Sequence, residues 1–480
     1  MRLPSHKTKI VCTIGPSCRH PNMIEKMIKK GMNVARLNFS HGDFAQHAAD
    51  IRHIREAGAR LDRVVGILID LPGVKMRIGK IPDGPVMLKN GDTVTLTTRS
   101  INGTAKRIPV QYKHLPRSVS KDSIIFLNDG FIQLKVIKVS GSEILCRIII
   151  GGPISTHKGI NLPGAKTFVN AVTKKDLECI DFALRHNVHT FGLSFVEKAS
   201  DINRVREFAR KKGKSINLVA KIERREALEN MDGILQAADA VMIARGDLGI
   251  EMPTEQVPII QKELIHKANL LGKPIITATQ MLGSMTKNVR PTRAEVNDVA
   301  NAILDGTDAV MLSEETAAGD YPLEAVEMMV KIAVSAEHLS SRGQLSHEIR
   351  DEIRSRMTTG GLSVPDVISL NAVGAAEKLN AKYIITPTSS GSTARRISRF
   401  KPHCWILSFT NRVEVCRFLM FSYGLYPFQT HKKSTSLLSE LRKKLKRLGL
   451  VHSGDTIIIA ERRISEQSGE TDSMGIMTIE

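Results

Sequence analysis

Two neighbouring stretches, Leu218–Glu223 (L-V-A-K-I-E) and Val241–Glu251 (V-M-I-A-R-G-D-L-G-I-E), decide how this chain folds. Each begins as a short apolar run, which is typical of a strand buried in a parallel sheet, and each ends abruptly in charged residues. The segment between them, Arg225–Ala237, has the pattern of a helix. The pair therefore predicts one strand–helix–strand unit, whose charged ends meet at the same edge of a parallel sheet.

The residues at those two strand ends have the chemistry of a metal-assisted site. Glu223 and Asp247 are carboxylates with no histidine or cysteine cluster nearby. Such a pair suits a hard cation that keeps some of its waters and binds a phosphate at its remaining coordination positions. Lys221 and Glu223 are two residues apart, so on a strand they face the same side, and the ammonium can meet an anionic reacting group. The alternative is an ion-pair network that caps the two strands, because structural ion pairs also fill such positions.

Further apolar runs alternate with helical patterns along the chain. Together with the first two runs, they predict a closed parallel (β/α)8 TIM barrel with its active site at the C-terminal strand ends. The strands are expected at Lys9–Ile14, Asn33–Phe39, Val64–Asp70, His189–Phe195, Leu218–Glu223, the run from Val241, Pro274–Thr277 and Ala309–Leu312.

At 480 residues the chain is too long for one compact core, and its pattern changes twice. After Asp70 the chain becomes rich in strands and turn residues, which predicts a small β-barrel inserted over the barrel mouth, a candidate lid. A polar and charged stretch, from about Leu339 to Ser363, precedes an open α/β region. The expected domains are residues 1–70 and 168–340 (TIM barrel), 71–167 (β lid) and 341–480 (C-terminal α/β regulatory domain).

The formal net charge of +20 allows two interpretations, attraction to anionic partners or dispersed surface lysines. The basic residues are spread along the chain, and the densest run, Arg442–Arg447, continues a helical pattern from Leu437. We therefore favour a solvated helix face and expect no nucleic-acid partner.

Other bulk features indicate a cytoplasmic enzyme. The six cysteines are scattered without the spacing of a zinc site, which is typical of a reducing compartment. Met1–Lys9 is polar and basic, so no signal peptide is expected. No apolar run reaches the roughly 18 to 20 residues that a membrane helix needs, so no membrane partner is expected.

If the barrel is correct, the polar residues that end its strands should converge on one site. Basic residues for phosphate, two carboxylates for a metal, a central lysine and hydroxyl groups for proton transfer together indicate phosphoryl transfer. Each residue also has an ordinary structural alternative, such as a helix cap for Ser or Thr. The converging residues are Arg36, Asn38, Ser40, Asp70, Lys198, Lys221, Glu223, Asp247, Thr277, Thr279, Ser313, Glu314 and Glu315.

Over its whole length the sequence resembles the pyruvate kinases. The resemblance implies that phosphoenolpyruvate and ADP become pyruvate and ATP, the last step of glycolysis, in a homotetramer that needs Mg²⁺ or Mn²⁺. The stretches that carry it are T-K-I-V-C-T-I-G-P (8–16), G-M-N-V-A-R-L-N-F-S-H-G (31–42), K-G-I-N-L-P-G (158–164), A-K-I-E (220–223), M-I-A-R-G-D-L-G-I-E (242–251), T-A-T-Q-M-L-G-S-M (277–285), P-T-R-A-E-V-N-D-V-A-N-A (291–302) and D-G-T-D-A-V-M-L-S-E-E-T-A-A-G-D-Y-P (305–322).

The resemblance also implies roles for individual residues. Glu223 and Asp247 would hold the divalent metal, and Lys221 would stabilise charge on the transferring phosphoryl group and the enolate oxygen. Thr279 and Ser313 would lie on the route that protonates the enolate carbon.

Further residues that match the family would bind the rest of the substrates. The backbone of Gly246 and Asp247, together with Thr279, would receive the substrate carboxylate, and Arg36 and Arg77 would contact phosphates. The nucleotide side would be lined by Pro16, Asn38, His41, Arg77 and Lys198.

One segment departs from the common family pattern. Many pyruvate kinases also need potassium, held at positions that match Asn38, Ser40, Asp70 and the Leu71 carbonyl, and carry Thr-Lys-Gly-Pro-Glu after the aspartate. Here Leu-Pro-Gly-Val-Lys follows, so Lys75 replaces the glutamate, as in the potassium-independent branch. We hypothesise that the Lys75 ammonium replaces the monovalent cation, so that K⁺ is not required. The alternative is a lysine that points to solvent.

The C-terminal region carries T-P-T-S-S-G-S-T-A-R-R (386–396) between a strand and a helix. Small residues with spare N–H groups at a helix start can cradle a phosphate, and the stretch matches the family's effector loop for sugar phosphates. An ordinary Ser/Thr-capped helix is the alternative. A second effector turn, at 461–463 and 469–472, is altered, so the sugar-phosphate or nucleotide effector is not specified. The loop residues are Thr388, Ser389, Ser390, Gly391, Ser392 and Thr393.

Two other functions compete with phosphoryl transfer. Another barrel enzyme that handles enolpyruvate with a metal, such as an aldolase or carboxylase, would not need the lid, Lys198 and the T-A-T-Q segment together. A non-catalytic basic protein that binds nucleic acid should have lost the charged strand ends first, yet they are all present.

Overall fold

Among the residues that the structure describes, eight parallel strands close into a barrel in the order β1-β16-β15-β14-β13-β12-β3-β2. This confirms the predicted TIM barrel. The computed structural model describes residues 3–82, 84–128, 130–165, 168, 171–340, 344–358, 362–430, 437–461 and 471–480. The barrel strands are β1 (Lys9–Thr13), β2 (Val34–Asn38), β3 (Gly66–Asp70), β12 (Thr190–Leu193), β13 (Asn217–Ile222), β14 (Ala240–Ala244), β15 (Ile275–Ala278) and β16 (Ala309–Leu312).

Helices surround the barrel, and one of them differs from its prediction. The segment predicted as a single helix over Arg225–Ala237 is broken at Asn230, whose side-chain amide donates to the carbonyls of Glu226 and Glu197. An asparagine that bonds nearby backbone in this way competes with helix continuation. The barrel helices are α1 (Pro21–Lys30), α2 (Phe44–Arg60), α4 (Lys174–Arg185), α5 (Ala199–Lys211), α6 (Arg225–Glu229), α7 (Met231–Ala237), α8 (Arg245–Glu251), α9 (Val257–Leu270), α10 (Arg293–Leu304), α11 (Glu314–Ala317) and α12 (Pro322–Ser340).

The strand side chains alternate between two hydrophobic layers. In β1, Ile10 and Cys12 pack with the surrounding helices, whereas Val11 belongs to the cluster inside the barrel. That inner cluster also contains Phe418 and Phe421, which come from the C-terminal region and are buried. The C-terminal region therefore packs against the barrel interior.

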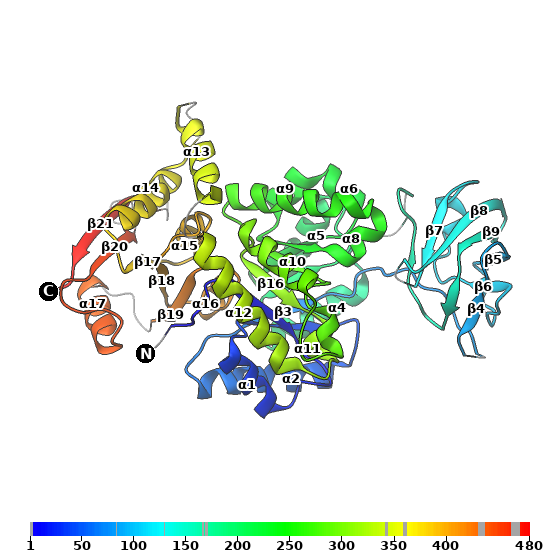
Figure 1. Ribbon diagram of the computed structural model, residues 1–480, viewed down its shortest axis with the longest axis horizontal. Coiled ribbons are helices and arrows are strands. Elements are labelled where there is room, and N and C mark those ends of the chain that lie inside the picture. The colour runs from blue at the N-terminus through cyan, green and yellow to red at the C-terminus, as the bar shows by residue number, and fades with distance from the viewer. Residues whose placement is uncertain are drawn as a thin grey trace.

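The insert between β3 and α4 has its own apolar core, which supports the prediction of a separate lid. Figure 1 shows it at one end of the molecule, with the barrel in the middle and the C-terminal sheet at the other end. It consists of a six-stranded sheet, β11-β7-β8-β9-β5-β6, and a two-stranded sheet, β10-β4. Its elements are β4 (Val86–Leu88), β5 (Thr93–Thr97), β6 (Arg107–Pro109), α3 (Leu115–Ser118), β7 (Ile124–Leu127), β8 (Ile132–Ser140), β9 (Glu143–Ile150), β10 (Gly152–Ile154) and β11 (Ile160–Asn161).

The C-terminal region folds as the predicted open α/β sheet, in the order β19-β18-β17-β20-β21. The sequence analysis did not identify β19, whose L-Y-P-F-Q run contains Pro427. β19 is an edge strand, where proline is tolerated. The elements are α13 (Gln344–Thr358), α14 (Val364–Lys378), β17 (Tyr383–Pro387), α15 (Ser392–Ser398), β18 (Trp405–Thr410), α16 (Val413–Leu419), β19 (Leu425–Gln429), α17 (Leu437–Arg447), β20 (Thr456–Glu461) and β21 (Ser473–Thr478).

Two further findings concern the described residues as a whole. None of the helices they form is both long enough and apolar enough to span a membrane. The cysteines at 12, 18, 146, 179, 404 and 416 are all buried and unpaired, which agrees with the interpretation of them as small core residues.

Two buried lysines join the barrel to the C-terminal region. Lys9 is only 1% exposed, and its ammonium donates to the Leu425 carbonyl at 2.6 Å. Lys401 pairs with Asp308 at 2.8 Å. Burial lowers the pKa of Lys9 to about 7, although Glu337 and Asp308 oppose the shift. The charged form of Lys9 is therefore costly in the folded state.

This burial predicts a pH-dependent stability. Above pH 7 the folded chain releases the Lys9 proton, whereas an unfolded lysine keeps it up to about pH 10.5, so the unfolded chain binds more protons and stability rises with pH. Between pH 7 and 9, wild type should gain about 2 kcal/mol relative to Lys9→Met, seen as diverging thermal unfolding midpoints. Lys7→Met, at the less buried neighbour, should follow wild type. Parallel curves for wild type and Lys9→Met would contradict the prediction.

Candidate active site

The ammonium group of Lys221, at the C-terminal end of β13, is the centre of a buried charged cluster. Its Nζ lies 3.0 Å from Asp70 Oδ1 and 2.9 Å from Glu223 Oε1. It also donates to Ser194 Oγ at 2.8 Å. Burial alone would lower the pKa of Lys221, but the two carboxylates outweigh it and raise that pKa. The two carboxylates therefore favour the charged form of Lys221.

Asp70 connects this lysine to a second cation. Its Oδ2 accepts from Arg36 Nε at 2.8 Å and lies 2.6 Å from Arg36 Nη2. Arg36 Nη1 donates to Thr13 Oγ1 at 2.9 Å. Burial would raise the pKa of Asp70, but Lys221 and Arg36 hold it below its usual range. Sequence analysis placed Asp70 among the converging strand-end residues and in a monovalent-cation site, and in the structure it is the shared counter-ion of both bases.

The ionised form of Glu223 is unfavourable in this site. Its side chain is 1% exposed, and its Oε2 accepts from the Phe195 N–H at 2.6 Å. Burial raises the pKa of Glu223, Lys221 opposes the shift, and the nearby Asp247 adds to it. A divalent cation between the two carboxylates would relieve this repulsion.

A small cavity of about 10 Å³ lies where the lid joins the barrel. Glu223 and Asp247 line it from the barrel side, and Lys75 and Asn161 line it from the lid side. The donors are carboxylate oxygens, which fits Mg²⁺ or Mn²⁺ rather than a softer metal. Within the described part of the chain, no three His, Cys, Asp or Glu side chains gather in a way that could hold a metal.

A second group of site residues spans the ends of β14 and β15. α8 begins at Arg245, so Gly246 and Asp247 lie in its first turn. The Gly246 N–H donates to Thr279 Oγ1 at 2.8 Å, and Thr279 Oγ1 donates to the Ala278 carbonyl at 2.7 Å. The structure therefore brings Gly246 and Thr279 together, as predicted.

Ser313 ends β16, and its hydroxyl is unusual. Within the described residues, its buried Oγ has no hydrogen-bond partner. Glu315 fixes the surrounding backbone, because its Oε2 accepts from the Ser313 N–H at 2.6 Å and its Oε1 from the Leu282 N–H at 3.2 Å. The loops after β15 and β16 are thus held together.

The residues predicted for the nucleotide side lie outside the buried cluster. Pro16, His41 and Lys198 are exposed. Asn38 Oδ1 accepts from the Ser40 N–H at 3.1 Å, and Arg77 Nη1 donates to the His157 carbonyl of the lid at 3.0 Å. Pro16, Asn38, His41 and Lys198 lie at or just after the C-terminal ends of β1, β2 and β12, whereas Arg77 belongs to the insert.

The positions predicted for a monovalent cation lie in two different places, the Lys221 cluster and the small cavity. The Leu71 carbonyl accepts from Ser194 Oγ at 2.8 Å and so belongs to the Lys221 cluster. Lys75 is an exposed residue that lines the small cavity with Glu223 and Asp247.

The predicted effector loop leads into α15. Gly391 has a left-handed φ of 77°, and its N–H donates to Thr388 Oγ1 at 2.8 Å. The Ser392 N–H donates to Ser390 Oγ at 3.3 Å, and the hydroxyls of Thr393 and Thr471 bond to each other. Residues 462–463 and 469–470 of the second effector turn lie outside the described residues.

Sequence analysis missed several functional candidates. Ser194, at the end of T-F-G-L-S-F, and Thr13 could have been found by the same strand-end logic. Glu251 in α8 had no such signal. Burial raises the pKa of Glu251 to about 7, although Arg224 opposes the shift, and its carboxylate bonds to the side chain of Asn161 in the lid.

Comparisons with known proteins agree along the whole chain. Two family models match, "Pyruvate kinase, barrel domain" over residues 5–326 and "Pyruvate kinase, alpha/beta domain" over residues 366–477. The chain is 49% identical to a pyruvate kinase of Thermococcus litoralis over all of both sequences. It is 42% identical to one of Staphylococcus aureus (strain MRSA252), covering 98% of this chain and 80% of that protein.

A solved structure shows the same similarity. The crystal structure of a pyruvate kinase from Cryptosporidium parvum superposes with a TM-score of 0.91 at 38% identity, covering 99% of this chain and 97% of that one. The two family models cover the barrel with its charged strand ends and the C-terminal sheet, and the relatives match over nearly the full chain. The chain therefore belongs to the pyruvate kinase family.

Proposed function

We propose that the cluster around Lys221 transfers the phosphoryl group of phosphoenolpyruvate to ADP and so forms pyruvate and ATP. The observation that carries the proposal is the buried Lys221 ammonium, fixed 2.9 Å from Glu223 and 3.0 Å from Asp70 at the C-terminal strand ends. A fixed positive charge in a buried site stabilises the negative charge that develops during phosphoryl transfer.

Glu223 and Asp247 would hold Mg²⁺ or Mn²⁺. When bound, the divalent cation supplies charge neutralisation at phosphoryl and carboxylate oxygens. Lys221 stabilises the transferring phosphoryl group and the enolate oxygen, and Arg36 and Arg77 contact phosphates. Arg36 is well placed for this role, because Asp70 and Thr13 fix its guanidinium.

The remaining residues would bind the substrate carboxylate and deliver a proton. Gly246, Asp247 and Thr279 receive the carboxylate, which the hydrogen bond between Gly246 and Thr279 supports. Thr279 and Ser313 lie on the route by which the enolate carbon gains its proton, and the buried Ser313 hydroxyl is a group without a protein partner among the described residues. The lid, residues 71–167, closes over Pro16, Asn38, His41 and Lys198 and excludes water.

Replacing Lys221 tests this function. In Lys221→Met the fixed charge is lost, so kcat for pyruvate formation should fall by about 100-fold or more. The measurement follows pyruvate from phosphoenolpyruvate, ADP and Mg²⁺. Lys212→Met, which removes an exposed lysine paired with Asp181, should leave kcat unchanged. A Lys221→Met enzyme within threefold of wild type would refute the role.

We also propose that the enzyme needs no K⁺, because the Lys75 ammonium takes the place of a monovalent cation near Asn38, Ser40, Asp70 and Leu71. Lys75 lines the same cavity as Glu223 and Asp247, and this position supports the proposal that its ammonium charge acts in the active site.

A charge reversal separates this role from that of a solvent-exposed lysine. Wild type should be fully active in buffer free of sodium and potassium, and Lys75→Glu should become active only when KCl is added. Lys80→Glu makes the same change at an exposed lysine of the same segment and should create no KCl requirement. Wild-type activity that depends on KCl would exclude the Lys75 role and leave the enzyme assignment intact.

The C-terminal loop at Thr388–Thr393 would bind the phosphate of a sugar-phosphate or nucleotide effector, in a cytoplasmic homotetramer. Gly391 in the left-handed conformation immediately before α15 supports this proposal, because such a turn directs backbone N–H groups toward an anion.

A negative charge in this loop should abolish regulation. In wild type, fructose 1,6-bisphosphate or AMP should lower the KM for phosphoenolpyruvate, and Ser392→Asp should remove that response by repelling phosphate while basal kcat is kept. Ser453→Asp adds the same charge at an exposed site of the same region and should respond like wild type. If Ser392→Asp responds normally, the loop is not the effector site.

A further inference from the structure

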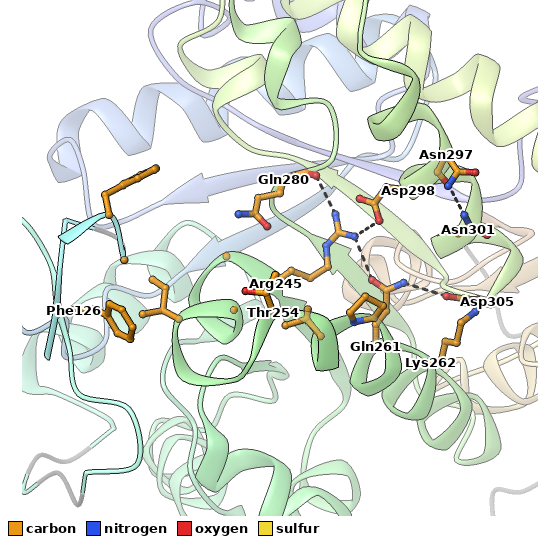
Figure 2. A pocket seen from close by; sticks show the side chains of 17 residues that line it. Phe126, Arg245, Thr254, Gln261, Lys262, Gln280, Asn297, Asp298, Asn301 and Asp305 are labelled. Atoms are coloured by element: carbon orange, nitrogen blue, oxygen red, sulfur yellow. Dashed lines mark hydrogen bonds and ion pairs between the residues drawn. The ribbon is translucent and has the colours of Figure 1, made fainter. Parts of the chain in front are cut away.

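Arg245 is the first residue of α8 and lines a second cavity, distinct from the small cavity that Glu223 and Asp247 line. The residue follows β14 directly and is only 7% exposed. Its side chain lines a cavity of about 750 Å³ between the lid residue Phe126 and helices α8, α9 and α10 (Figure 2). None of the roles proposed above uses this guanidinium, although its backbone neighbours, Gly246 and Asp247, are both substrate-site candidates.

One edge of the guanidinium holds the loop that follows β15. Arg245 Nη2 donates to the Thr279 carbonyl at 2.8 Å and to the Gln280 carbonyl at 3.2 Å. It also lies 2.7 Å from Met281 Sδ. Three successive residues of this loop thus contact a single nitrogen of Arg245, whose two N–H groups face the two carbonyls.

The other edge is anchored to two helices. Arg245 Nη1 lies 2.7 Å from Asp298 Oδ1 in α10 and donates to Gln261 Oε1 in α9 at 3.3 Å. Gln261 donates in turn to Asp305 Oδ2 at 3.1 Å (Figure 2). The planar guanidinium therefore bridges the loop and the helices as a fork, which a lysine cannot reproduce.

The loop needs such an anchor because its backbone is strained. Thr279 and Gln280 have φ of 64° and 54°, so two consecutive residues that are not glycine adopt the left-handed conformation. Side chains disfavour this conformation, and it persists only where surrounding contacts fix it. The bonds from Arg245 to both carbonyls are contacts of that kind.

Arg245 is also connected to the side chain of Thr279, through the backbone of Gly246. The backbone continues from Arg245 to Gly246, whose N–H donates to Thr279 Oγ1 at 2.8 Å. The side chain of Arg245 thus holds the Thr279 carbonyl, while the next residue holds the Thr279 hydroxyl. A movement of Arg245 would turn Thr279 and shift Gly246 at the same time.

We propose that Arg245 is a positioning residue for phosphoenolpyruvate, which sets the Thr279 hydroxyl and the start of α8 by fixing the left-handed Thr279–Gln280 turn. This inference rests on the proposed role of Thr279 in binding the substrate carboxylate. It assigns no contact between Arg245 and substrate.

Arg245→Lys tests the proposal, because it keeps the charge and loses the fork. The KM for phosphoenolpyruvate should rise at least about tenfold, a loss of about 1.4 kcal/mol, whereas the KM for ADP should stay within twofold of wild type. Arg206→Lys is the matched control, since Arg206 Nη2 likewise donates to a carbonyl, that of Ala237, at 2.8 Å and pairs with Asp239 at 2.9 Å. This control should change neither KM.

Chemical rescue gives a second and independent readout. Millimolar guanidinium should restore phosphoenolpyruvate affinity to Arg245→Ala, and methylammonium should not. If Arg245→Ala does not fold, the two KM values of Arg245→Lys still decide. An Arg245→Lys enzyme whose two KM values rise in proportion, or whose KM for phosphoenolpyruvate is unchanged, would overturn the inference. Wild type that forms no pyruvate would instead refute the proposed function itself.

Discussion

The rest of the site depends on a lysine ammonium buried between two carboxylates. A buried charge is tolerated only when it is paired and hydrogen-bonded, and Lys221 satisfies this through Asp70, Glu223 and the Ser194 hydroxyl. Because Asp70 also pairs with Arg36, the network joins β2, β3, β12 and β13 at one end of the barrel. Removing one member would leave another charge buried without a partner.

This network is rigid because the barrel around it is closed and packed. Alternate strand residues fill the interior, and Phe418 and Phe421 of the C-terminal region extend that cluster. Lys9 bonds to Leu425 and Lys401 to Asp308, so the C-terminal region and the barrel share buried charges as well as apolar surface. The C-terminal region is therefore packed directly against the barrel whose strands carry the charged cluster.

The sequence predicts the elements and the convergence of the strand ends, but it does not predict most of the individual side-chain pairs between distant segments. The barrel strands follow from apolar runs, and the shared face of Lys221 and Glu223 follows from strand periodicity. The pairing of Asp70 with two bases, and of Arg245 with Thr279, joins segments whose register only the closed barrel fixes. The prediction of one helix over Arg225–Ala237 was wrong because Asn230 breaks it, and the edge strand β19, which contains Pro427, was not identified.

Burial and the nearby charge of Asp247 raise the pKa of Glu223, so the ionised form of this carboxylate is unfavourable before any metal binds. A bound divalent cation would favour the ionised form. The most direct test is therefore the binding of Mn²⁺ itself, by titration calorimetry of wild type and Glu223→Gln, with Glu226→Gln as control. We predict one strong site per chain in wild type and the control, weakened at least about tenfold in Glu223→Gln. Equal Mn²⁺ affinity in all three proteins would contradict a metal site at these strand ends.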